Sequence, residues 1–171
     1  MSNYMVEAKS RADLRNLALE FRKLLQLENV LYFPIVELLD VMTEFFKGFS
    51  YEIVEDDVFT DNIHADTDIT TGHIRIKESI YEGACNGEGR DRMTIAHEIG
   101  HFFTICICGF RLTRNFTHTE AITFRDPEWQ AKCFAGELMV PAHLVRGMGT
   151  HEIAKRCGVS DDAARVQNKH L

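Results

Sequence analysis

Apolar residues recur at three- and four-residue intervals in the first part of this chain. Within residues 6–27 they occupy Leu14, Leu17, Ala18, Phe21, Leu24 and Leu25. The same period follows Pro34, a residue suited to the start of a helix, and continues to Gly48. This spacing predicts two amphipathic helices, each with one apolar face that must be buried against further structure.

Alternation of apolar with polar residues predicts strands in two further segments. The first is residues 49–54, and the second is residues 62–81, where Ile74 and Ile76 alternate with charged neighbours. Turn signals flank and interrupt the second segment. We expect the glycine-rich residues 83–89 to form a connecting loop.

Helical patterns return in the second half of the chain. We expect one helix over residues 90–108, then a loop, then a helix from Asp126 to about Val140. Asp126 suits the N-cap of that helix and Pro127 its first position. A shorter helix is expected after Pro141. The sequence therefore predicts an α+β fold, with helices packed on a small sheet.

The end of the chain predicts two short helices separated at Gly158, with the outline of a helix-turn-helix. We therefore expect a main domain over residues 1–149 and a helical tail over residues 150–171. Asp161 and Asp162 begin the second short helix, where helix-turn-helix proteins contact DNA. Because these carboxylates would repel phosphate, direct nucleic-acid binding is not expected.

Charge and cysteine content argue against several classes of protein. Lys and Arg number 19 against 26 Asp and Glu, so the formal net charge is −7, which disfavours general binding to nucleic acid or to a membrane surface. We expect no membrane span and no signal peptide. The five cysteines form no CxxC pair. These features predict a cytoplasmic protein with reduced thiols.

His97-Glu98-Ile99-Gly100-His101 is the sharpest functional signal in the chain. Histidines four residues apart on a helix have Cβ atoms about 5–6 Å apart, so both imidazoles can bind one divalent ion. Glu98 lies about 100° further round the helix, where its carboxylate can act on a water molecule. Apolar residues surround the motif, so its polar groups need buried partners. The alternative is a helix whose histidines are satisfied without a metal.

A catalytic zinc site needs a third protein ligand. Ile107 stands where a metzincin would have its third histidine, and the downstream carboxylates are Glu120, Asp126, Glu128 and Glu137. Glu128 is the best placed, in the first turn of a predicted helix. The helix dipole would also favour a carboxylate there without any metal, so the residues alone leave both interpretations open.

Residues 97–102 and 127–141 together resemble the ImmA/IrrE family of metallopeptidases. In that family the second helix follows the form E-x-x-A-x-x-F-A-x-x-L-L-M-P, and this chain matches it from Glu128 to Pro141, with Met139-Val140 in place of Leu-Met. The resemblance implies a zincin-like fold and identifies Glu128 as the third ligand of Zn²⁺, after His97 and His101.

The resemblance also implies a strand that binds substrate. In zincin folds the strand beside the active-site helix is a sheet edge, to which substrate adds as an antiparallel strand. This role falls on His73, Ile74, Arg75 and Ile76, with a simple core strand as the alternative. His118 is a candidate oxyanion donor by position only, and a solvated loop histidine is the alternative.

The expected function is a zinc-dependent endopeptidase with Glu98 as general base. The family resemblance implies a helix-turn-helix transcriptional repressor as the protein substrate, whose cleavage derepresses stress, prophage or mobile-element genes. One alternative is a metal-bound regulatory or toxin–antitoxin-type module that holds a partner without cutting it, for which Glu98 would be unnecessary. A DNA-binding regulator is a further alternative, which the charge of −7 disfavours.

Overall fold

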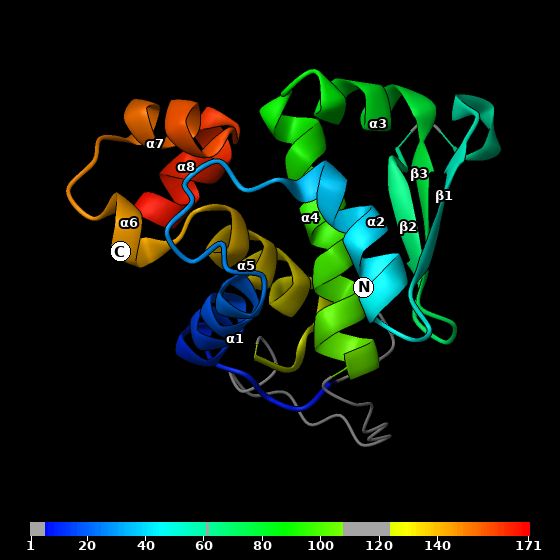
Figure 1. Cartoon of the computed structure of the whole chain (residues 1–171), viewed down its shortest axis with the longest axis horizontal. Helices are drawn as coiled ribbons and strands as arrows, with labels where there is room; N and C mark the ends of the chain where they lie inside the picture. Colours follow the sequence, from blue (N-terminus) through cyan, green and yellow to red (C-terminus); the bar gives the residue numbers. More distant parts are fainter. Residues whose placement is uncertain (1–5, 61, 108–123) are drawn as a thin grey trace.

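The structure is a computed structural model, and it describes residues 6–60, 62–107 and 124–171. Figure 1 shows a small sheet at one side of the molecule, a long helix beside it, and further helices on the other side of that helix. The predicted α+β class is confirmed. The helices are α1 (Arg11–Leu24), α2 (Ile35–Phe45), α3 (Glu78–Cys85), α4 (Gly89–His101), α5 (Pro127–Met139), α6 (Ala142–Val145), α7 (Thr150–Cys157) and α8 (Asp161–Asn168). A 3₁₀ turn spans Asp56–Val58, and a π-helical segment, Phe102–Ile107, continues α4.

The sheet is three-stranded and mixed. Its strands are β1 (Ser50–Val54), β2 (Ala65–Asp68) and β3 (His73–Lys77), in the order β1-β3-β2. β3 pairs in parallel with β1 and antiparallel with β2, so both of its edges carry hydrogen bonds. The expectation that this strand is a sheet edge is therefore wrong. Alternation reports that one face of a strand is buried, but it does not distinguish a central strand from an edge strand.

A second correction concerns the segment after β3. Residues 78–85 form helix α3, whereas the sequence pattern predicted strand to residue 81 and a loop from residue 83. Ile80 and Ala84, four residues apart, are the buried positions of this helix. In so short a segment, one such pair gives too weak a helical period to outweigh the strand pattern that precedes it.

Several predicted helix boundaries are confirmed. The Asp126 carboxylate accepts a hydrogen bond from the Glu128 backbone N–H, and Pro127 opens α5. The tail forms two short helices separated at Gly158, whose φ of +64° lies in the left-handed region that glycine tolerates. The division of the chain at residue 149 stays a prediction. No helix in the described ranges is long and apolar enough to cross a membrane.

The core is built around the contact between α4 and α5. Phe103, just after α4, stacks on Phe134 of α5 with ring centroids 5.3 Å apart, and Phe21 of α1 packs on Phe103 at 4.3 Å. Closer to the motif, the two helices meet backbone to backbone. A Cβ atom added to Gly100 would lie 2.6 Å from the Ala131 carbonyl oxygen. Glycine at this position therefore allows the two helices to approach closely.

We expect Gly100→Ala to lower the free energy of unfolding by about 1–3 kcal/mol, the usual cost of overpacking. Helix propensity alone would favour alanine by about 1 kcal/mol, so a loss of stability rather than a gain would show that the close contact exists. Gly83→Ala is the matched control, because Gly83 is also helical but its added Cβ would meet only the movable Asp91 carboxylate. Urea denaturation measures both variants. Equal stability of the two would contradict the close contact.

Candidate metal centre

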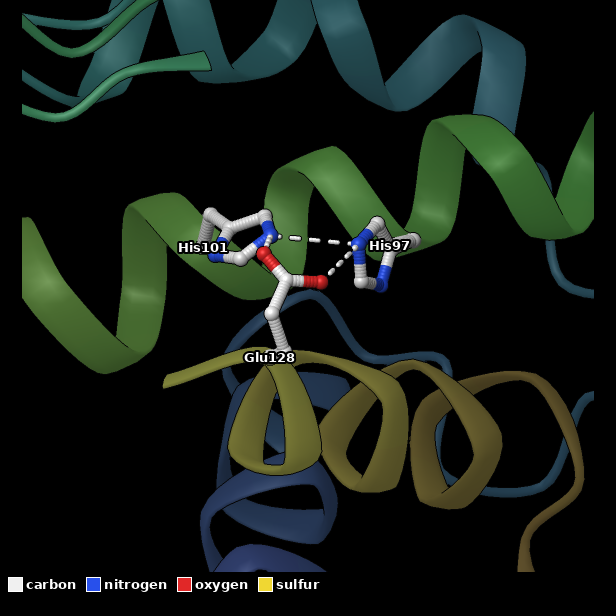
Figure 2. A group of neighbouring side chains, drawn as sticks. All are labelled: His97, His101 and Glu128. Carbon is white, nitrogen blue, oxygen red and sulfur yellow. Dashed lines mark hydrogen bonds and ion pairs between the residues drawn. The ribbon is translucent and has the colours of Figure 1, made fainter. Parts of the chain in front are cut away.

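Helix α4 places His97 and His101 on one face, one turn apart. Their Nε2 atoms lie 3.1 Å from each other, and both rings are largely removed from solvent. Figure 2 shows the two imidazoles converging on the same point between α4 and α5. The spacing read from the sequence therefore produces the juxtaposition that a shared ion would need.

Helix α5 brings Glu128 to the same point. Its Oε2 lies 3.4 Å from His97 Nε2, and its Oε1 lies 3.2 Å from His101 Nε2 (Figure 2). The Asp126 carboxylate at the N-cap accepts a hydrogen bond from the Glu128 backbone N–H, which fixes the first turn that carries Glu128. Within the part of the chain that the structure describes, these three residues form the one group of ligand-type side chains close enough to hold a metal ion.

The three side chains suit a tetrahedral divalent ion. Donors at about 2.0–2.1 Å from zinc lie about 3.3 Å from each other in a tetrahedron. The two imidazole nitrogens are 3.1 Å apart, and Glu128 places Oε2 3.4 Å from that of His97 and Oε1 3.2 Å from that of His101, so each separation is close to this value. Three side chains leave one tetrahedral position for water or substrate, which is the arrangement of a catalytic rather than a structural site.

Burial also sets the protonation state of the histidines. Removal from water lowers the pKa of His97 to about 3, with smaller contributions from the charges of His101 and Lys132. Burial likewise lowers the pKa of His101, although the Glu128 carboxylate opposes it. Both rings are therefore neutral near pH 7, as metal binding requires. Their Nδ1 atoms are buried and have no hydrogen-bond partner among the described residues.

Glu98 occupies a separate position beside this cluster. Its Oε2 accepts a 2.6 Å hydrogen bond from the Thr67 hydroxyl of β2. Burial raises the pKa of the Glu98 carboxyl to about 7; the Thr67 hydrogen bond acts in the opposite direction, and the Glu128 charge adds to the rise. A carboxyl group with a pKa near neutrality can both accept and return a proton.

A cleft of about 870 Å³ contains all four side chains. Its walls come from β2 and the residues beside it, from α4 and from α5. Strand β2 contributes Ala65, Asp66 and Thr67 to the lining. This volume lies within the range of sites that enclose a substantial ligand. The strand that borders the cleft is thus β2, which is an edge strand, and not β3.

The four residues of β3 that the sequence predicted to bind substrate do not line the cleft. Ile74 and Ile76 are fully buried in the core. Arg75 forms an ion pair with Asp66, and His73 contacts Ser50 and Glu52. None of the four lines the cleft. The remaining candidate, His118, lies outside the described residues.

Sequence reasoning missed two side chains of this site. Thr67 reaches Glu98 only through the packing of β2 against α4, and no local pattern marks it. Lys132 also lines the cleft, one turn after Glu128 on α5. Its spacing of four residues from Glu128 was a usable signal, because such residues share a helix face.

The fold and the site together define a small α+β protein with a two-histidine, one-carboxylate centre in an open cleft. The family model of Peptidase_M78, described as the IrrE N-terminal-like domain, matches residues 52–167. The match covers well over half of the chain, and the chain belongs to this family. Membership supports a function of the metallopeptidase type and confirms the ImmA/IrrE resemblance.

Other comparisons extend the fold assignment. A solved structure described as a Mycobacterium tuberculosis transcriptional regulator is similar, with a TM-score of 0.59 and 15% sequence identity. The similarity covers 90% of this chain and 45% of that one, so this chain spans less than half the length of its structural relative. The comparison with curated proteins found no match.

We expect the protein, purified without chelator or histidine tag, to carry about one divalent ion per chain. Glu128→Gln removes the charge of one ligand and should weaken binding by at least about tenfold. Glu152→Gln, an exposed change on α7, is the control and should leave binding intact. Elemental analysis and metal titration measure both. Unchanged affinity in Glu128→Gln would exclude this carboxylate as a ligand.

Proposed function

We propose that this protein is a zinc-dependent endopeptidase in which His97, His101 and Glu128 bind the metal and Glu98 is the general base. One observation carries the proposal: three ligand-type atoms converge within 4.8 Å in a chain of a peptidase family. Two histidines and one carboxylate form a ligand set typical of zinc peptidases, although other divalent ions can occupy such a set.

The chemistry divides between the metal and the protein. A bound zinc ion would polarise the scissile carbonyl and lower the pKa of a water molecule. Glu98 takes the proton from the attacking water and later donates it to the leaving amine nitrogen. The Thr67 hydroxyl holds the Glu98 carboxylate in one orientation during both transfers. The neutral state of His97 and His101 preserves their Nε2 lone pairs for binding.

We assign the role of substrate-binding strand to β2. This strand pairs with β3 on one side, and its residues Ala65–Thr67 line the cleft. A substrate segment in extended conformation could add to its outer edge through main-chain hydrogen bonds. Such addition would bring a peptide bond past Glu98, because Thr67 of the same strand contacts that carboxylate.

The substrate we propose is a helix-turn-helix transcriptional repressor in the cytoplasm, whose cleavage derepresses stress or mobile-element genes. The ImmA/IrrE resemblance supports this choice. The description of the structural relative as a transcriptional regulator is consistent with a role in gene control. Direct DNA binding is not part of the proposal, because Asp161 and Asp162 stand exposed at the start of α8.

Glu98→Gln should retain zinc but lose cleavage by at least about a hundredfold, because the amide cannot take a proton. The test mixes zinc-loaded protein with purified helix-turn-helix repressors of the same organism and follows fragments by mass spectrometry. Fragments with the unaltered protein and none with Glu98→Gln are expected. A stable complex without fragments would instead favour a binding module, and full activity of the variant would exclude Glu98 as the base.

Thr67→Val removes the hydroxyl that orients Glu98 and keeps the shape of the side chain. A hydrogen bond to a charged group contributes about 1.5–3 kcal/mol, so kcat should fall roughly tenfold or more with zinc content unchanged. Thr67→Ser restores the donor and should recover most of the rate. Steady-state kinetics on the same substrate decide this, and a Val variant as fast as the Ser variant would contradict the role.

A further inference from the structure

A second hollow lies next to the main cleft, between α4, α5 and α8. It measures about 210 Å³, and its lining combines the apolar side chains of Met93, Val140, Ala163 and Val166 with Gly136 and with the polar side chains of Lys132, Asp162 and Gln167. The volume is below the usual range of about 300–1,000 Å³ for pockets that hold whole small molecules. The hollow is therefore suited to a single side chain of a larger ligand.

The hollow adjoins the candidate active site, because Met93 and Lys132 line both spaces. Glu128, Lys132 and Gly136 of α5 and its C-cap Val140 follow at four-residue steps, so one face of this helix runs from the candidate metal centre to the hollow. A chain lying along this face would pass from Glu128 to the hollow past the Lys132 ammonium group.

Two features of α8 indicate that something occupies the hollow. Val166 keeps 52% of its surface exposed although it is apolar and lies beside other apolar side chains. Gln167 is 97% buried by contrast, with 3% of its surface exposed, and its Oε1 accepts a hydrogen bond from Arg11. Its Nε2 has no partner among the described residues, and a main-chain carbonyl of a bound polypeptide could supply the acceptor that an apolar side chain lacks.

The geometry points to a specificity subsite: the hollow formed by α4, α5 and α8 binds an apolar side chain of the polypeptide substrate. This inference rests on the proposed function and extends it. Gly136 follows Glu128 by eight positions, which is about 12 Å along the helix axis. An extended peptide advances about 3.3 Å per residue. The apolar residue therefore lies about three to four positions from the scissile bond, and the tail selects substrates through Val166.

Reciprocal charge substitutions at Val166 test the subsite. Zinc-loaded protein is incubated with a proteome-derived peptide library, and the residues around each cut are sequenced. We expect an apolar preference three to four positions from the cut, reduced about tenfold in Val166→Glu and Val166→Lys. The Glu variant should gain a preference for basic residues there and the Lys variant for acidic ones. Leu24→Glu, another exposed apolar residue but outside both spaces, is the matched control and should behave as the unaltered protein.

A binding measurement separates failure of the subsite from failure of the peptidase proposal. The same library is passed over immobilised, zinc-loaded Glu98→Gln protein, with and without Val166→Glu, and the retained peptides are sequenced. If peptides are cleaved and the residue preference around the cut is the same in the Val166 variants, only the subsite is overturned. Retention of apolar peptides that depends on Val166, without any cleavage, supports the subsite and overturns the peptidase. If the peptides are neither cleaved nor retained, both the subsite and the peptidase proposal are overturned.

Discussion

His97 and His101 belong to one helix and Glu128 to another, so the candidate metal centre exists only where α4 and α5 lie close together. Gly100 stands between the two histidine turns and faces the Ala131 backbone, where any larger residue would separate the helices. Phe103 and Phe134 continue the same contact into the core. The distance between the ligand atoms is therefore set by backbone packing, and the side chains need little adjustment to converge.

A buried ion-pair cluster holds the face of α5 that is opposite to Glu128. Glu137 accepts hydrogen bonds from Arg11 and Arg15 of α1 at 2.9 and 2.8 Å, although its own side chain is 1% exposed. Arg11 also contacts Gln167 of α8. Loss of both arginines would leave the buried Glu137 carboxylate without a counter-charge, which is far more costly than the ion pairs are favourable. The first helix and the tail thus share one anchor on the helix that carries Glu128.

The local spacing of residues predicted much of the site. The contacts between residues distant in the chain could not be predicted from it. The HExxH spacing places His97, Glu98 and His101 relative to one another because a helix fixes positions four residues apart. Glu128 sits on a different helix; its place in a first turn favoured it among the downstream carboxylates, but only the family resemblance identified it as a metal ligand rather than a residue favoured by the helix dipole. The strand order was beyond the sequence, because Ile74 and Ile76 alternate in the same way in a central strand as at an edge. The contact between Thr67 and Glu98 could not be predicted either, because the two residues are 31 positions apart in the sequence.

Removal from water acts on the titratable groups of α4 in two directions, and both serve a metal-dependent hydrolase. For an imidazole the charged form is the protonated one, so burial lowers the pKa of His97 and His101 and leaves them neutral. For a carboxyl group the charged form is the deprotonated one, so the same burial raises the pKa of Glu98 to about 7. An exposed helix with the same motif would have a weaker base, and protons would compete with the metal for its histidine nitrogens. The apolar surroundings of the motif are therefore part of the proposed chemistry, because the same burial sets the protonation state of the candidate ligands and of the candidate base.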